Sequence, residues 1–185
     1  KLEQEAFRAG IAARTKASME WFRSTVSNRK VSRAALIGDG PTRSRQVYGS
    51  MYNFQYDPKT KATLPYYDRF PLCIPVQKAK GGFYGLNLHY LHPLIRAQFL
   101  DELYDITNND KYDRTTKMNV TYQLLKSTSK MRFFKPCLKH YLSNQIQSPL
   151  LLIEPADWEI AIFLPTESFR KVDKNTVWNE SRSKF

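Results

Sequence analysis

Two prolines within one β-favouring run limit what this chain can fold into. The run "FPLCIPVQ" at 70–77 alternates apolar side chains as a half-buried strand does. Pro71 and Pro75 have no backbone N–H, so neither residue can donate to a hydrogen-bond ladder. We therefore expect a strand that lies at the edge of a sheet or pairs on one side only.

Further strand and helix patterns flank this run. Alternating aromatic residues precede it at 48–56, and the turn "KAKGG" leads into "FYGLNLHYL" at 83–91, where Gly85 indicates a bulge. A helix is expected after Pro93, because apolar residues recur there at spacings of three and four. The predicted class is α+β, with a small antiparallel sheet or partly open barrel and one or more packed helices.

The remaining chain is divided by its patterns into a core and two appended segments. Residues 117–147 fit a strand or a helix, whereas "PLLLIEP" and "DWEIAIFLP" are expected to pair as a hairpin. The tail from Lys171 is polar, with Trp178 as a predicted anchor. We expect a basic helical arm and connector at 1–45, a globular α+β core at 46–170 and an extended C-terminal tail at 171–185.

The N-terminal arm is both basic and amphipathic. Residues 1–50 carry ten Lys or Arg against four Asp or Glu, and apolar residues recur at helical spacing up to Val26. Such an arm suits a subunit that inserts into its neighbours and becomes ordered on assembly. Its predicted partner-binding residues are Phe7, Ile11, Trp21 and Phe22.

Charge narrows the choice of partners. The chain has 29 Lys and Arg against 17 Asp and Glu, a net charge of +12. Such a chain should bind polyanions such as nucleic acid or acidic protein surfaces. No apolar run approaches the roughly 18 residues that a membrane-spanning helix needs, so we expect no membrane partner. Cys73 and Cys137 are expected to be reduced, buried residues.

One long basic stretch is a candidate DNA-binding segment. From Arg114 to Ile153 there is no acidic residue, and aromatic residues are interleaved with the basic ones. Cations that neutralise phosphates beside aromatic rings that stack on bases are typical of sequence-tolerant DNA binding. The alternative is a solvated basic face over a core of aromatic rings. The candidate DNA-binding residues within 114–139 are Lys126, Lys130, Arg132, Lys135 and Lys139.

The stretch "YDPKTKATLPYYDRFPLCIP" at 56–75 combines prolines with aromatic rings and allows two interpretations. As a platform, it would expose its rings for stacking on bases. As a rigid joint, it would pack its rings inward or against a partner protein, with Asp68 and Arg69 as a local ion pair. We favour the joint, because the flanking alternation directs the rings into a core, and we predict partner contacts at Tyr66, Tyr67 and Arg69.

Catalytic and metal-binding patterns are weak. His89 and His92 lack a third ligand, so no metal and no cofactor are expected. The acids Glu154, Asp157 and Glu159 resemble the paired carboxylates of a magnesium-dependent nuclease, but no lysine follows them. We therefore expect no enzyme, and a nuclease ranks third among the hypotheses.

Four blocks of this sequence resemble a known family. These are "MYNFQYDPKTKATLPYYDRFPLCIP", "GGFYGLNLHYLHPLIRAQFLDEL", "FFKPCLKHYL" and "DWEIAIFLPTESF", within roughly residues 45–180. Together they are similar to virion structural and assembly proteins of large contractile-tailed bacteriophages, the T-even-like and cyanophage-like myoviruses. The resemblance carries no catalytic motif.

The resemblance implies two roles. The first is a non-enzymatic structural or assembly component in the neck, tail or baseplate, which binds neighbouring virion proteins through the arm and the aromatic-proline face. The alternative is a head-completion protein that protects DNA ends and binds double-stranded DNA through 114–139. Either role implies a virion protein that is assembled in the bacterial cytoplasm, and we expect several copies in a symmetric assembly.

Overall fold

A computed structural model describes residues 41–183 apart from 94, 97–98, 101–102, 104–110, 112, 129, 131, 156–157 and 164–165. Six strands form one antiparallel sheet in the order β1-β7-β2-β4-β5-β6, and β3 pairs with β8 separately. The strands are β1 (Thr42–Arg43), β2 (Met51–Asn53), β3 (Tyr67–Asp68), β4 (Leu72–Ala79), β5 (Gly82–Asn87), β6 (Leu138–Leu142), β7 (Leu150–Ile153) and β8 (Phe169–Arg170).

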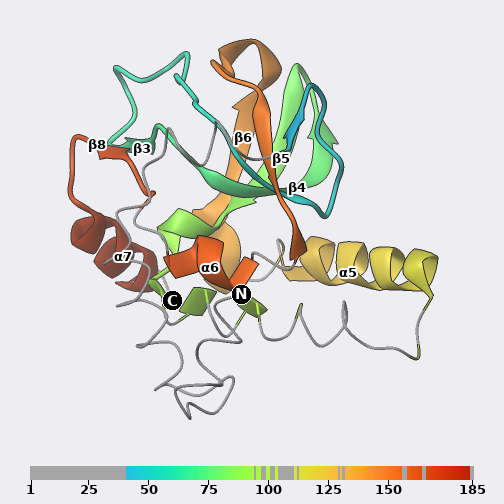
Figure 1. Cartoon of the computed structure of the whole chain (residues 1–185). Coiled ribbons are helices and arrows are strands. Elements are labelled where there is room, and N and C mark those ends of the chain that lie inside the picture. The colour runs from blue at the N-terminus through green and yellow to red at the C-terminus, as the bar shows by residue number, and fades with distance from the viewer. Residues whose placement is uncertain are drawn as a thin grey trace.

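The helices lie on one side of this sheet (Figure 1). They are α5 (Arg114–Thr128), α6 (Trp158–Phe163) and α7 (Lys174–Ser183), and described residues between Pro93 and Leu103 are also helical. Short 3-10 turns are η1 (Leu88–Tyr90), η2 (Arg132–Cys137) and η3 (Ser143–Gln145). The predicted α+β class is confirmed, and the sheet does not close into a barrel.

Successive strand residues point to opposite faces of the sheet, and here apolar residues occupy both faces. Met51, Leu72 and Ile74 belong to the core cluster that includes residues of the helices. Their neighbours Tyr52 and Cys73 belong to a second cluster, which is rich in aromatic rings. Both cysteines are free and buried, as predicted.

The proline-containing strand β4 is not an edge strand, so the first of the two predicted alternatives is wrong, and the second, one-sided pairing, holds for part of the strand. It lies between β2 and β5, yet its ladder with β2 includes only Leu72 and Cys73. The Pro75 carbonyl faces the β2 side, where it accepts a hydrogen bond from Gly49 N. The N–H that Pro75 lacks would face the same side, where the ladder has already ended. One-sided pairing from Pro75 onward therefore makes an interior strand compatible with proline.

Gly85 does lie beside a bulge, as predicted, but the extra residue is on the neighbouring strand β4 and not on its own strand. Its strand pairs regularly with β6, and the register shift falls on β4 between Pro75 and Gln77. A Cβ atom at Gly85 would overlap the Sγ of Cys73 on the neighbouring strand. The predicted strand at 83–91 also ends early, at Asn87, because the chain turns into η1.

Two further predictions for the second half were wrong. Residues 158–163 form helix α6 instead of a hairpin strand, since Trp158, Ala161 and Ile162 are buried at helical spacing. The tail at 171–185 is not extended, because Lys174–Ser183 forms α7. Trp178 does anchor this tail, for its Nε1 donates to the His89 carbonyl at 2.9 Å.

Helix α7 begins with a side-chain cap. The Asp173 carboxylate accepts hydrogen bonds from the backbone N–H groups of Asn175 and Thr176, which would otherwise lack partners. We expect Asp173→Ala to lower the Tm by roughly 2–4 °C. Calorimetry checks this, with the exposed Asn179→Ala in the same helix as the control. Equal Tm values for the two variants would contradict the role of the cap.

Candidate nucleic-acid interface

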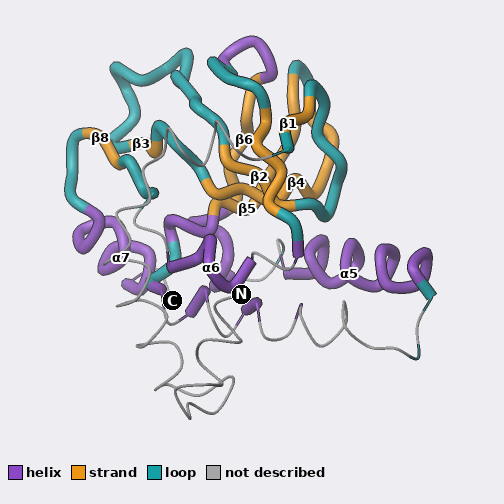
Figure 2. Tube along the Cα trace, viewed as in Figure 1, coloured by secondary structure: helices purple, strands orange, loops and turns teal. Residues whose placement is uncertain are grey.

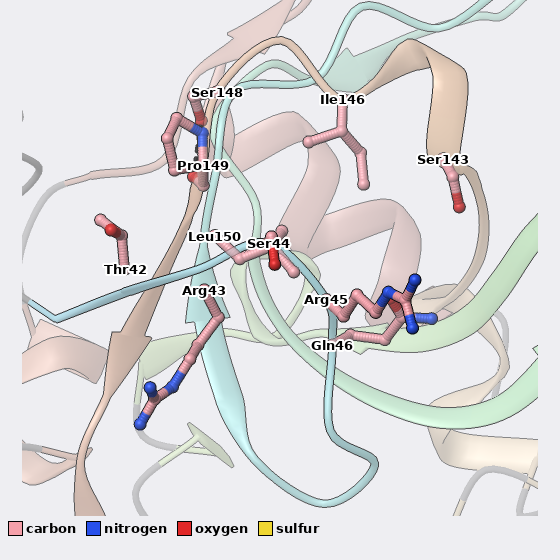
Figure 3. Close-up of a pocket in the computed structure, with 10 residues that line it drawn as sticks. All are labelled: Thr42, Arg43, Ser44, Arg45, Gln46, Ser143, Ile146, Ser148, Pro149 and Leu150. Carbon is pink, nitrogen blue, oxygen red and sulfur yellow. Dashed lines mark hydrogen bonds between the residues drawn. The ribbon is translucent and has the colours of Figure 1, made fainter.

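A basic groove lies at the β1 edge of the sheet, where β1 pairs with β7 (Figure 3). Its volume is about 620 Å³. Arg43 and Arg45 are exposed, and none of the lining residues is acidic. The side chains lining it are Thr42, Arg43, Ser44, Arg45, Gln46, Ser143, Ile146, Ser148, Pro149 and Leu150.

The arginine groove, as we call this site, is held by backbone pairing between distant segments. Thr42 pairs with Leu151, and the Pro41 carbonyl accepts from Leu152 N at 2.8 Å. Figure 3 shows the guanidinium groups of Arg43 and Arg45 pointing in different directions. They are therefore placed to contact separate anionic groups, with the serine and threonine hydroxyls as additional donors.

A second cavity, the tyrosine pocket, opens on the other side of the segment 142–146. Its volume is about 470 Å³. Five of its lining residues are tyrosines, and Lys59, Lys139 and His140 are basic residues among its lining. The lining residues are Tyr56, Pro58, Lys59, Thr60, Leu64, Tyr66, Tyr67, Asp68, Tyr90, Lys139, His140, Tyr141 and Leu142.

Beneath this pocket lies a buried polar network centred on Asp68. Its Oδ2 lies 2.6 Å from Nδ1 of His89 and accepts from Asn87 Nδ2, while its Oδ1 accepts from the backbone N–H groups of Phe70 and Ser168. Burial alone would raise the pKa of Asp68, but His89 and these donors outweigh it and lower the pKa. The predicted ion pair between Asp68 and Arg69 is therefore wrong, since Arg69 is exposed.

The network resembles a catalytic triad in its connectivity. Nε2 of His89 lies 3.1 Å from the Thr166 hydroxyl, on the opposite side of the ring from Asp68. Thr166 and His89 are, however, only 2% and 0% exposed, so no substrate can reach the hydroxyl. This geometry fits a structural role: it joins β3, η1 and the segment before β8.

The structure brings together two groups of residues that the sequence had kept apart. Tyr66 and Tyr67, predicted to bind partners, line the same pocket as Lys139, predicted to bind DNA. Tyr66 is half-buried and packs against Tyr90 and Phe169, as the joint interpretation expects. Burial and a hydrogen bond to Glu180 raise the pKa of Tyr66 to about 12.

The other predicted basic residues are spread over the surface. Lys126 is exposed on α5, Lys130 follows that helix, and Lys135 is exposed on η2. The side chain of Arg132 is not described. Lys139 alone, among the described members of this set, lines one of the two cavities. Phe7, Ile11, Trp21 and Phe22 lie outside the described residues.

The candidate acidic and histidine sites do not converge either. Asp57 pairs with Lys61 at 2.7 Å, and Glu154 is exposed beyond β7. The side chains of Asp157 and Glu159 are not described. No group of three or more metal-binding side chains occurs in the part of the chain that the structure describes. Within the same residues, no helix is long and apolar enough to cross a membrane.

Comparison with protein-family models gives a match to the Phage T4 terminal DNA protecting protein over residues 1–182. The chain belongs to this family. It is thus a protein of the T4-like phages, as the resemblance of its sequence blocks indicated. No curated protein and no solved structure matches the chain. The family supports the alternative role in DNA-end protection and gives no support to a position in the neck, tail or baseplate.

Arg43 and Arg45 are the site residues that sequence reasoning missed. They fall in the segment 1–45 that was assigned to the arm and connector, whereas the structure pairs Thr42–Arg43 with the sheet. Two arginines within "TRSRQ", followed by a strand, were the available signal. Only the pairing of β1 with β7 brings them into one groove with Ser143 and Ser148.

Proposed function

We propose that this protein binds the termini of double-stranded phage DNA and protects them, without cleaving DNA itself. The observation that carries the proposal is an acid-free arginine groove in a member of a DNA-end protecting family. Guanidinium groups and hydroxyls that bind phosphates fix a protein on DNA without reading its sequence. A protective protein needs this property, since a terminus must be covered whatever its sequence.

The electrostatics of the whole chain favour the same partner. A net charge of +12 attracts DNA from a distance and accelerates association at low ionic strength. Exposed Lys126, Lys130 and Lys135 extend the basic surface beyond the groove. In this proposal they contribute to general attraction, while Arg43 and Arg45 hold phosphates directly.

The absence of cleavage is part of the proposal and is supported by the placement of two of the described acids. Asp68 is buried against His89, and Asp57 is paired with Lys61, so neither presents a free carboxylate for magnesium. We also propose that the protein resides in the virion, at the ends of the packaged genome. The predicted contacts with other virion proteins remain a prediction, because their main residues lie in the arm.

Two short duplexes of the same sequence test the proposal, one with open ends and one with both ends closed by hairpins. We expect the full chain to bind the open duplex more tightly and to slow its digestion by an exonuclease. Affinity should fall as salt rises, with a log–log slope of about −0.9 for each phosphate contacted. No binding in dilute buffer would refute the proposal, and magnesium-dependent cleavage by the protein would refute its non-enzymatic part.

A further inference from the structure

We propose that the tyrosine pocket holds the last nucleotide of a DNA terminus in unpaired form, with its base inside and its phosphate at the rim. This inference rests on the proposed function, and it specifies which part of a DNA end the protein recognises. The volume of about 470 Å³ lies within the roughly 300–1,000 Å³ that is usual for small-molecule sites. A single nucleotide is a ligand of the right size, whereas a duplex is not.

The interior of the pocket suits a base better than a phosphate. Tyr66 and Tyr67 are only half-buried and can present ring surface to a ligand. Tyr56, Tyr90 and Tyr141, by contrast, are at most 7% exposed and line the pocket as packed wall. Aromatic side chains offer flat surfaces on which any base can stack. Asp68 is also in the lining, but its carboxylate is occupied by His89, Asn87 and two backbone N–H groups, so the interior offers a phosphate no cation there.

The rim of the pocket is basic. Lys59 and His140 are exposed, and Nζ of Lys139 lies 3.9 Å from the centroid of the Tyr90 ring. These groups are placed to contact the phosphate of a nucleotide whose base lies against the tyrosines. The separation of an aromatic interior from a basic rim therefore orients the ligand with its base inward.

The pocket adjoins the arginine groove across a short wall. Leu142 lines the pocket, while its neighbour Ser143 lines the groove. Ile146 of the groove forms a β-bridge with Tyr56 of the pocket, and Asp57 N donates to the Gln145 carbonyl. In Figure 2 the helical turn η3, which forms this wall, is the purple turn at the top of the sheet and stands between β1 and the loop that leads to β3. DNA phosphates in the groove would thus place the chain end near the pocket.

The loop 57–66, which lines the pocket opposite β6, is held in place by side-chain contacts. Nζ of Lys171 donates to the carbonyls of Ala62 and Leu64, and Lys61 is paired with Asp57. Lys171 adopts a positive φ of 76°, a backbone conformation that costs a non-glycine residue free energy. A loop that is already fixed loses little entropy when a ligand binds.

Two duplexes with a one-nucleotide overhang test the inference. They differ only in that the overhanging nucleotide of the second is abasic, so that the phosphates are identical. We expect the full chain to bind the first roughly 5- to 150-fold more tightly, because stacking of one base is worth about 1–3 kcal/mol. Lys59→Glu/Tyr67→Leu should abolish most of this ratio.

The matched control is Lys78→Glu/Tyr122→Leu, in which an exposed lysine and a half-buried tyrosine line neither cavity. This control should keep the ratio of the unaltered protein. Tight but equal binding of both duplexes would overturn the inference and leave the proposed function standing. Failure to bind either duplex would overturn both, and a ratio unchanged in Lys59→Glu/Tyr67→Leu would place the nucleotide elsewhere.

Discussion

Replacing Asp68 with alanine should lower the free energy of unfolding by about 3–5 kcal/mol. The carboxylate is 4% exposed and accepts hydrogen bonds from Asn87 Nδ2 and from two backbone N–H groups, in addition to its pairing with His89. Alanine would leave these groups buried without an acceptor, which is the most costly outcome for a polar core. Denaturant unfolding followed by tryptophan fluorescence measures the change.

Asp57→Ala is the matched control, because it removes an aspartate from an ion pair that is exposed to solvent. We expect little change in stability from it, since exposed pairs contribute little. If both variants unfolded at the same denaturant concentration, the buried network would not be the stabilising element. Unfolding confined to one segment of Asp68→Ala would also contradict the prediction, because Asp68 joins β3 to η1 and to the segment before β8.

Asp68 also makes the free energy of unfolding depend on pH. The pKa of Asp68 is lower in the folded chain than its ordinary value of 3.8. Its contribution to stability is therefore complete above that value and is lost as the pH falls through the lower, folded pKa. Unfolding measured from pH 5 downward should show this loss in the unaltered protein, and the curve for Asp68→Ala should be flatter there.

The fold class could be predicted from the sequence because local patterns determine it. Alternation and turn residues identified the strands around the prolines, and "KAKGG" gives the turn between β4 and β5. The position of β4 within the sheet could not be predicted this way. It depends on where the ladder with β2 stops, and that is a property of the pairing between segments about twenty residues apart.

The short helices were missed for a different reason. "WEIAIF" has a strand-like alternation and a helix-like spacing at once, and six residues do not separate the two. Packing of Trp158 and Ile162 into the main core decides the outcome. In α7 the signal was present, since Asp173 precedes a helical spacing of Val177, Trp178 and Ser181.

The candidate site shows the same limit. Sequence reasoning selected Tyr66, Tyr67 and Lys139, but it assigned them to different functions because they lie about 70 residues apart. Their meeting in one pocket requires the folding of β6 against β5 and the placement of the 57–66 loop. Charge counting, in turn, favoured the dense stretch at 114–139 over the isolated arginines at 43 and 45.

Reversing both charges in the arginine groove should have the largest effect on DNA binding. We expect Arg43→Glu/Arg45→Glu to lower the affinity for an open-ended duplex roughly 100-fold or more, since each charged hydrogen bond contributes about 1.5–3 kcal/mol. The slope of log affinity against log salt should become less negative by about 1.8, which corresponds to two lost phosphate contacts. Fluorescence anisotropy over a range of salt concentrations gives both quantities.

Lys78→Glu/Lys80→Glu provides the control, because it changes the net charge by the same amount at exposed positions that line neither cavity. This variant should weaken binding far less, through long-range attraction alone. Equal losses in the two double variants would show that total charge, and not the groove, determines affinity. A greater loss of DNA affinity from Lys126→Glu/Lys130→Glu/Lys135→Glu would show that the main DNA contact lies on α5 and η2. The groove variant should keep the stability of the unaltered protein, because both arginine side chains are exposed.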